Sequence, residues 1–402
     1  MNITSKIVAL SSAVAFALQI ALALLMLRYF SPEEVGMFSV ISQIGFFWTT
    51  FALAQAPLQL LANHGSSVLD DAREAWISSM QRFVWLLPVA ALAVWWSHLS
   101  FVSTLLWALL LSLCQLTWML AQSMRLRMVN LWPLASVRVL PPLTSLIFVG
   151  IAVLFSWDGP ALLSAALFGY ATGAIWLLPT IFHLHPTSAG HRPTYSGFIN
   201  DDRTTSLRIG HALVDALLAT AVVLVWQRLY GAEETGWMTA PLKVMGFFPA
   251  LMHTAWAQVF MAQPQHARTN SLWIGVGGFA IILILSATGA ISLKMGWLNS
   301  HWQGTMFYLL PLALWQGCAC ISAAYSHRPF EFHVAHRYSW FCMGIAAIQG
   351  GVLFAPFILA TKPITPIAHI WLFTSTSGLG LLAIAYWLAN LSPSPEESRT
   401  KP

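Results

Sequence analysis

Long apolar runs alternate with short polar segments along most of this chain. Each apolar run holds about 20 residues with few charges, which is the length of an α-helix that crosses a bilayer. The pattern therefore predicts an all-α polytopic membrane protein with about twelve transmembrane helices. The first six are expected near Ile7–Leu27, Val35–Ala62, Phe83–Val102, Ser103–Met124, Val139–Trp157 and Pro160–Phe182. The second six are expected near Ile209–Tyr230, Thr235–Ala262, Leu272–Leu293, His301–Tyr325, Trp340–Ala360 and Pro366–Ala389.

The predicted helices form two sets of six, with a polar segment between them. We expect an N-terminal lobe at residues 1–182, a cytoplasmic linker at 183–208, a C-terminal lobe at 209–390 and a disordered cytoplasmic tail at 391–402. Within the first lobe, the charged stretch Asn63–Arg82 is expected to be a loop.

A motif between the first two predicted helices occurs twice. The sequence of Arg28–Met37 recurs in register at Arg228–Trp237. Recurring polar residues at fixed spacing are rare in so apolar a chain, and a period this long indicates a duplicated domain. The matched residues are Arg28, Glu33, Glu34 and Gly36 in the first copy and Arg228, Glu233, Glu234 and Gly236 in the second.

The first copy of the motif also has a local structural interpretation. Ser31 suits the N-cap of a helix, Pro32 suits its first position, and Glu34 stands where a capping box needs an acid. Glu33 and Glu34 complement the positive end of that helix, and Arg28 complements the negative end of the helix before it. The motif therefore predicts a tight structural turn between two apolar helices.

The duplication also predicts how the two lobes are related. Six predicted helices separate the copies, and six is an even number, so both halves enter the membrane in the same orientation. They are then parallel repeats, related by an axis along the membrane normal. Two such lobes around a central cavity would move a substrate by alternating access.

Composition and charge support a membrane protein. Hydrophobic residues make up 57% of the chain, charged residues 8%, and the mean hydropathy is +0.69, whereas soluble domains carry roughly 25% charged residues. Most Lys and Arg residues fall on the side of the predicted termini, which places both termini in the cytoplasm. This bias also accounts for the net charge of +5 without a nucleic-acid partner. The four cysteines lie in apolar runs, and their spacing predicts neither a disulfide framework nor a metal site.

The hairpin sequence Arg-Tyr-Phe-Ser-Pro-Glu-Glu-Val-Gly-Met-Phe-Ser, which starts at Arg28 and follows a first apolar helix, resembles that of a transporter family. This family is the polysaccharide-transporter branch of the multidrug/oligosaccharidyl-lipid/polysaccharide exporter superfamily, which contains the O-antigen and exopolysaccharide repeat-unit flippases. The resemblance implies a non-enzymatic protein of the bacterial inner membrane, without cofactors, that flips undecaprenyl-diphosphate-linked oligosaccharides. It also implies membrane lipids and other polysaccharide-assembly proteins as partners.

Ionisable groups inside predicted helices are costly in a bilayer, so each is a candidate functional residue. Asp215 is the only carboxylate well inside a predicted helix, and His211 lies one turn earlier on the same face. Lys243 and His253 follow in the next helix, whereas Gln43 occupies the position of Lys243 in the first copy. The second lobe therefore carries the charge within the membrane.

Three hypotheses account for these charges. In the first, Lys243 attracts the diphosphate or an acidic sugar of the cargo, and Asp215 with His211 couples transport to protons or sodium ions. In the second, Asp215 and Lys243 form an interhelical ion pair that fixes packing. In the third, the charged side chains extend along their helices to a membrane interface.

Amide and guanidinium groups supply further candidates. Gln43 and Gln55 suit sugar hydroxyls, but amides also join helices to one another by hydrogen bonds. Arg125 and Arg127 flank a short predicted cytoplasmic loop. They either recruit an anionic lipid headgroup or simply follow the positive-inside bias.

Two other functions compete with the flippase interpretation. A cation-coupled multidrug exporter of the same fold would need only a small ligand, with Asp215 at its centre. A polysaccharide polymerase or ligase belongs to another class, and such membrane enzymes need a sizeable extracytoplasmic loop. The short predicted loops argue against an enzyme.

Overall fold

The computed structural model describes residues 3–54, 56–62, 67–128, 130–157, 159–182, 203–252, 267–332, 334–358 and 364–391. In these ranges every regular element is a helix. Nine of the helices found there are long and apolar enough to cross a membrane, and one bent pair makes a tenth candidate. The predicted all-α polytopic membrane fold is confirmed.

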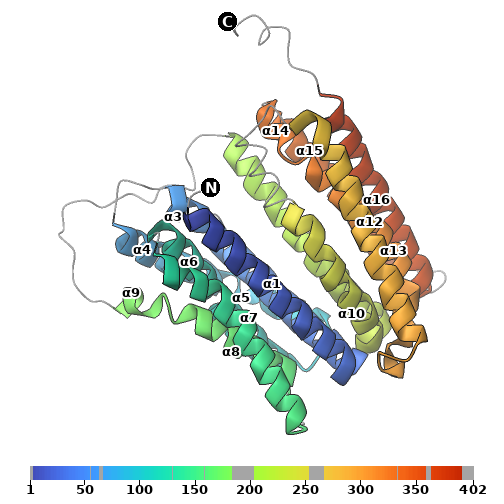
Figure 1. Ribbon diagram of the computed structural model, residues 1–402, viewed down its shortest axis with the longest axis horizontal. Coiled ribbons are helices and arrows are strands. Elements are labelled where there is room, and N and C mark those ends of the chain that lie inside the picture. The colour runs from blue at the N-terminus through green and yellow to red at the C-terminus, as the bar shows by residue number, and fades with distance from the viewer. Residues whose placement is uncertain are drawn as a thin grey trace, which may run out of the picture. The chain divides into compact units, whose positions relative to one another are not determined.

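The chain forms two compact units. The first holds Met1–Asp202 with Trp226–Ala232, and the second holds Arg203–Val225 with Glu233–Pro402. Figure 1 shows the helices of the first unit from blue to green. They are α1 (Ile3–Tyr29), α2 (Pro32–Leu53), α3 (Ala56–Ala62), α4 (Val68–Trp85), α5 (Leu87–Trp96), α6 (Phe101–Met128), α7 (Leu131–Leu154), α8 (Ala161–Ala174) and α9 (Leu178–Phe182).

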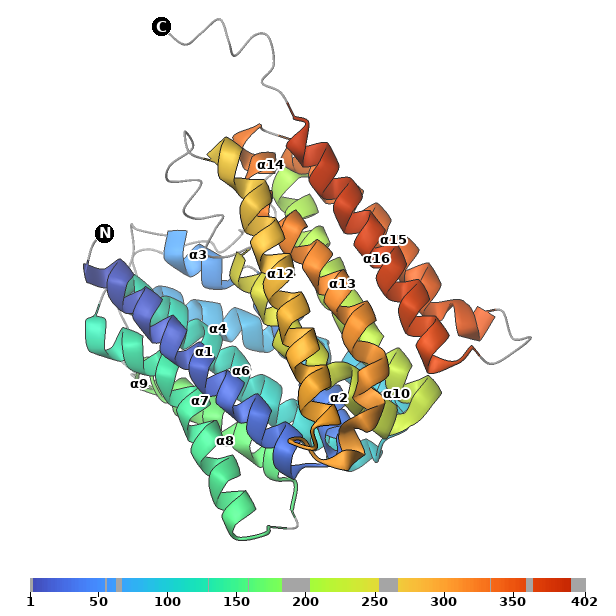
Figure 2. The same cartoon turned by 45° about the vertical axis from the view of Figure 1, so that its right-hand side comes forward.

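The second unit takes most of α10 and all later helices. In it α12 packs against α13, α13 packs against α16, and α15 packs against α16 (Figure 2). The elements are α10 (Arg203–Leu251), α12 (Ala267–Lys294), η3 (Ser300–Thr305), α13 (Met306–Ala324), α14 (Arg328–Glu331), α15 (Ala335–Ile358) and α16 (Pro366–Ala389). The predicted linker lies mostly outside the described residues, and the predicted tail lies almost wholly outside them.

The second motif divides α10 at a kink. The predicted helices on either side of it meet at Gly231, which alone within α10 is non-helical, with φ of 87° and ψ of −179°. A positive φ is cheap for glycine because it has no Cβ. The predicted helix Pro160–Phe182 is instead divided into α8 and α9, which have 14 and 5 residues.

The predicted span Phe83–Val102 and the predicted loop before it are wrong. Helix α4 already begins at Val68, and α5 follows it at a bend of 47°. Pro88 lies in the first turn of α5, where it lacks the N–H that would bond to the carbonyl of Val84, and this breaks the helix. The charged residues of this stretch suggest a solvated loop. In the structure, however, one of them, Asp71, is buried within a helix.

The predicted turn at the first motif is confirmed in atomic detail. The Ser31 hydroxyl oxygen accepts the backbone N–H of Glu34 at 3.3 Å, and the Glu34 carboxylate accepts the backbone N–H of Ser31 at 2.8 Å. These reciprocal bonds form a capping box, with Pro32 at the first position of α2. The cap satisfies backbone donors that the first turn of a helix otherwise leaves unpaired.

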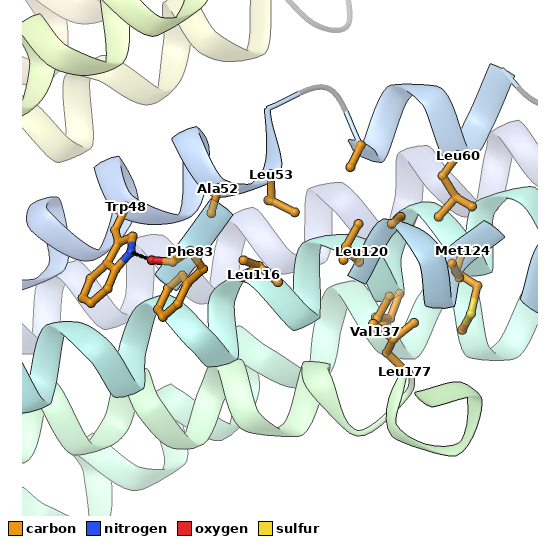
Figure 3. Close-up of a cluster of buried hydrophobic side chains, with 14 of the residues drawn as sticks. Trp48, Ala52, Leu53, Leu60, Phe83, Leu116, Leu120, Met124, Val137 and Leu177 are labelled. Carbon is orange, nitrogen blue, oxygen red and sulfur yellow. Dashed lines mark hydrogen bonds between the residues drawn. The ribbon is translucent and has the colours of Figure 1, made fainter. Parts of the chain in front are cut away.

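A buried apolar cluster fastens the helices of the first unit (Figure 3). Trp48 of α2 is buried and stacks on Phe83 of α4 with ring centroids 4.3 Å apart. The indole N–H of Trp48 also donates to the Phe83 carbonyl at 2.8 Å. Leu116 and Leu120 of α6 belong to the same cluster, together with residues of α3, α5 and α7. Aromatic stacking together with a satisfied indole N–H makes Trp48 a packing residue.

In the second unit a buried arginine of α14, Arg328, caps the C-terminal end of α16. Arg328 donates to the carbonyl oxygens of Leu388 and Ala389 at 2.5 and 2.7 Å. These carbonyls end α16, where helical carbonyls lack partners. Burial, and after it the charge of Arg328, lowers the pKa of the adjacent His327 from 6.5 to about 4.

Candidate functional site

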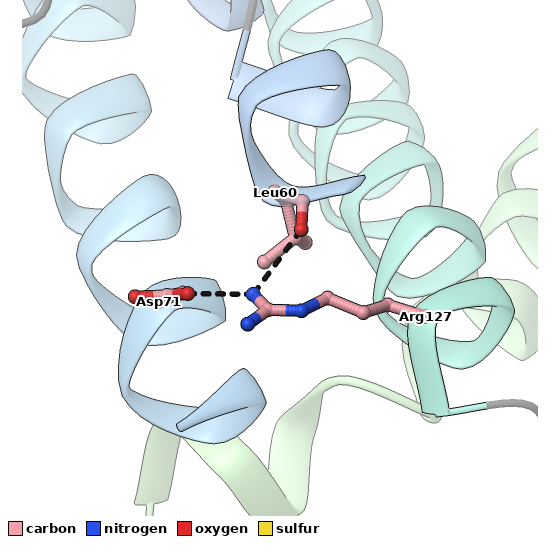
Figure 4. A network of polar contacts seen from close by, with 3 residues as sticks. All are labelled: Leu60, Asp71 and Arg127. Atoms are coloured by element: carbon pink, nitrogen blue, oxygen red, sulfur yellow. Dashed lines mark hydrogen bonds and ion pairs between the residues drawn. The ribbon is translucent and has the colours of Figure 1, made fainter. Parts of the chain in front are cut away.

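Arg127, a predicted headgroup contact, lies in a buried ion pair. Its Nη1 atom is 2.5 Å from Oδ2 of Asp71 and 3.2 Å from the carbonyl oxygen of Leu60 (Figure 4). The side chains of Arg127 and Asp71 are 6% and 1% exposed. A guanidinium enclosed in this way joins α6 to α3 and α4, and it is not presented to a lipid headgroup.

Arg125 is more accessible and is also engaged. It donates from Nη2 to the carbonyl oxygen of Trp176 at 2.9 Å, and its guanidinium lies 5.3 Å from the centre of the Trp176 ring. The contact holds the end of α6 to the segment between α8 and α9. Its geometry is that of a cation–π pair, and Arg125 as a whole is half-buried.

The structure brings His211 and Asp215 together, as their spacing on one helix face predicts. His211 Nε2 lies 3.2 Å from Asp215 Oδ2, and the side chains are 18% and 61% exposed. The His211 ring meets Tyr338 of α15 edge-on, with ring centroids 5.6 Å apart. One side of the pair is therefore packed against α15, while the carboxylate stays accessible to a proton or a cation.

Lys243 and Asp215 are both on α10, but the ion pair that the structure gives Asp215 is with His211. Lys243 has an exposed side chain, and Gln43 is half-buried in α2. The hypothesis of an interhelical pair between Asp215 and Lys243 therefore has no contact to support it among the described residues. Gln55 and His253 lie outside those residues.

The residues of both motif copies lie close to a helix end or a helix kink. Arg28 is in the last turn of α1, and Glu33 and Glu34 are in the first turn of α2. Gly36 is buried in α2, and its counterpart Gly236 is buried in α10. Arg228, Glu233 and Glu234 surround the kink of α10 at Gly231.

Glu234 has a different partner from its counterpart in the first copy. Gly231 and Ala232 replace Ser31 and Pro32, so no side-chain hydroxyl is present to form a capping box. The Glu234 carboxylate instead accepts the hydroxyl of Tyr308, which is buried at the start of α13. The second copy thus retains the glutamate, but this glutamate binds a tyrosine on another helix and does not cap its own helix.

Each unit has a cavity beside its copy of the motif. The cavity of the first unit has a volume of about 440 Å³ and includes Glu34 and Met37 in its wall. The cavity of the second unit has a volume of about 860 Å³ and includes Glu234 and Trp237. Both volumes lie within the usual range of about 300–1,000 Å³ for small-ligand pockets.

Sequence reasoning missed several residues of the second cavity. Trp237, Lys294, His301 and Tyr308 all line it, although the sequence pattern indicates only that they belong to predicted helices or loops. The available signal was the replacement of Met37 by Trp237 within an otherwise matched motif. In the described part of the chain, no three His, Cys, Asp or Glu side chains are placed to hold a metal ion.

Comparisons with known proteins show the fold. No protein-family model and no curated protein matches the sequence. The solved structure "Lipid II flippase MurJ, inward closed conformation" matches with a TM-score of 0.62 and 13% identity, over 97% of this chain and 88% of that chain. An inward-facing multidrug resistance MATE family transporter of the MOP superfamily matches with a TM-score of 0.55 and 10% identity, over 96% of this chain and 94% of that chain. The chain therefore has the polytopic helical fold of the MurJ lipid II flippase and of a MATE transporter of the MOP superfamily.

Proposed function

We propose that this protein flips lipid-linked oligosaccharides across the bacterial inner membrane by alternating access. The cargo would be an undecaprenyl-diphosphate-linked repeat unit for O-antigen or exopolysaccharide synthesis. The observation that carries the proposal is the match to a lipid II flippase over nearly the full length of both chains. The resemblance of the Arg28 hairpin to the polysaccharide transporters supports the choice of a glycan cargo.

Charge within the second unit suits such a cargo. Lys243, whose side chain is exposed on α10, would attract the diphosphate, because a cation inside a membrane protein attracts anionic groups strongly. Asp215, held by His211, would bind the proton or sodium ion that drives the cycle. We place both termini in the cytoplasm, with membrane lipids and other polysaccharide-assembly proteins as partners.

A vesicle assay tests the proposal directly. The purified protein is reconstituted with a fluorescent undecaprenyl-diphosphate oligosaccharide, and a membrane-impermeant quencher reports the lipid exposed on the outer leaflet. We expect the protein to accelerate movement between leaflets, with a further increase under a proton or sodium gradient. Protein-containing vesicles that are indistinguishable from empty ones would refute flipping.

A second candidate is a cation-coupled exporter of small drugs. The exposed Asp215 carboxylate beside His211 and the match to a MATE transporter favour it. The same vesicles would then accumulate ethidium when a proton or sodium gradient is imposed. Ethidium uptake that Asp215→Asn abolishes, with no movement of the glycolipid, would select this function over flipping.

A further inference from the structure

The cavity beside the second motif is the counterpart of the one beside the first. In the first unit, the wall is formed by the starts of α2, α6 and α8, which are the second, fourth and sixth predicted helices of their set. In the second unit, residues after the kink of α10 and the starts of α13 and α16 contribute. These belong to the same three predicted helices of the second set. The duplication has therefore produced two equivalent cavities, whose walls can be compared position by position.

The two walls differ in their chemistry. Glu34 is the one charged residue among those that line the first cavity, and most of the others are apolar. The second cavity is lined by two carboxylates, from Glu233 and Glu234, by the ammonium of Lys294, and by His301. Exposed side chains of Glu233, Lys294 and His301 can hydrogen-bond to a polar ligand.

An aromatic ring is fixed in the wall of the second cavity. The indole N–H of Trp237 donates to the carbonyl oxygen of His301 at 2.9 Å. The ring also lies directly over Gly304, where a Cβ atom would clash with it. Trp237 remains partly exposed. A ring held by a hydrogen bond and by backbone contact loses little entropy when a ligand stacks on it.

The polar groups beside this ring are also fixed in part. Tyr308 is 1% exposed and donates its hydroxyl to Glu234, which orients that carboxylate in the wall. In the first cavity, the capping box of Ser31 uses the equivalent carboxylate. The second acid is thus no longer needed for a cap and is available to the cavity.

We propose that the second cavity binds one saccharide unit of the exported glycan, stacked on Trp237 and hydrogen-bonded by Glu233. This inference rests on the proposed function and adds a subsite to it. A ligand pocket of this size is typically apolar and aromatic with a few placed polar groups, and a sugar ring offers both an apolar face and hydroxyls. Two carboxylates against one ammonium favour neutral and amino sugars and oppose uronic acids, since like charges repel.

Saccharide binding to the purified full-length protein tests this subsite. The probes are galactose, rhamnose, glucosamine, N-acetylglucosamine and glucuronic acid, measured by saturation-transfer NMR in lipid nanodiscs. We expect binding of at least one neutral or amino sugar, and no binding of glucuronic acid. Trp237→Ala and Glu233→Gln should each weaken that binding by about tenfold or more, whereas Trp237→Phe, which keeps a ring, should weaken it less.

The duplication supplies a matched control, Met37→Ala, at the equivalent position of the first cavity. Its sugar binding should equal that of the wild type, and melting curves would show that all variants are folded. Binding that survives Trp237→Ala, a preference for glucuronic acid, or no binding of any neutral or amino sugar would each overturn the proposal. The flipping assay on the same variants keeps the two proposals distinct. Flipping without Trp237-dependent sugar binding defeats only the subsite, and sugar binding without flipping defeats only the transport function.

Discussion

The Arg127 guanidinium lies 2.5 Å from the Asp71 carboxylate, and both side chains are almost fully enclosed. Removal of one partner strands a buried charge, which typically costs about 3–5 kcal/mol. Arg127→Gln and Asp71→Asn should therefore each lower the melting temperature and the yield of folded protein. The apolar double variant Asp71→Leu with Arg127→Met should recover much of this stability. Single variants as stable as the wild type would contradict a structural role for the pair.

The capping box at Ser31 allows a second stability test. Ser31→Ala removes the side chain that accepts the Glu34 N–H, and loss of such a cap costs about 0.5–2 kcal/mol. Ser31→Thr, which retains a hydroxyl, is the matched control. We expect a lower melting temperature in detergent for the alanine variant only. Equal loss of stability in both variants would point to packing rather than capping.

Lys243 and Asp215 should act independently of each other, because the structure pairs Asp215 with His211. Lys243→Gln should abolish flipping at normal protein level, and Lys243→Arg should restore part of it. The double variant Lys243→Gln with Asp215→Asn should stay inactive. Recovery in the double variant would reveal energetic coupling between the two residues, and Lys243 would then no longer be a cargo contact.

His327 should make stability depend on pH. Its pKa in the folded protein is about 4, below its ordinary value of about 6.5, so the unfolded chain binds the proton more readily. Stability is then full above about pH 6.5 and is lost as the pH falls towards 4. Melting temperatures across this range should fall more steeply for the wild type than for His327→Asn. Parallel curves would exclude His327 as the group responsible.

The predicted orientation is open to cysteine labelling. A cysteine placed at Thr187, in a chain whose four native cysteines are replaced, should react with an impermeant maleimide only after the cells are opened. A cysteine at Ala232 should react in intact cells, since the positive-inside bias places that turn outside. The opposite pattern would invert the topology.

The long apolar runs and the short polar segments between them made most helices predictable. The last predicted helix, Pro366–Ala389, matches α16 at both ends, and the cap at Ser31 followed from residue types alone. Helix α4 was missed because Asp71 and its neighbours appear solvated in the sequence. Asp71 is buried opposite Arg127, which lies 56 positions further along the chain.

The candidate residues were harder to predict, for the same reason. A spacing of four residues on one helix suffices to place His211 beside Asp215. No comparable rule links Glu234 to Tyr308, because that contact joins two helices that are distant in sequence. A residue type and its helix can be inferred from periodicity, but partners on other helices depend on packing.

The replacement of Ser31 by Gly231 in the second copy has an evolutionary consequence. In the first half, a change at the hairpin acid threatens folding, so selection must hold that position still. In the second half, the corresponding acid makes no cap, and its partner is the hydroxyl of Tyr308. These two positions can therefore change together without the loss of a helix cap. We therefore expect the hairpin of the first half to be the more constrained of the two and that of the second half to be the more adaptable. Divergence among proteins that share this repeated motif should then accumulate around Trp237 and Tyr308, and laboratory evolution of new ligand ranges is best directed there.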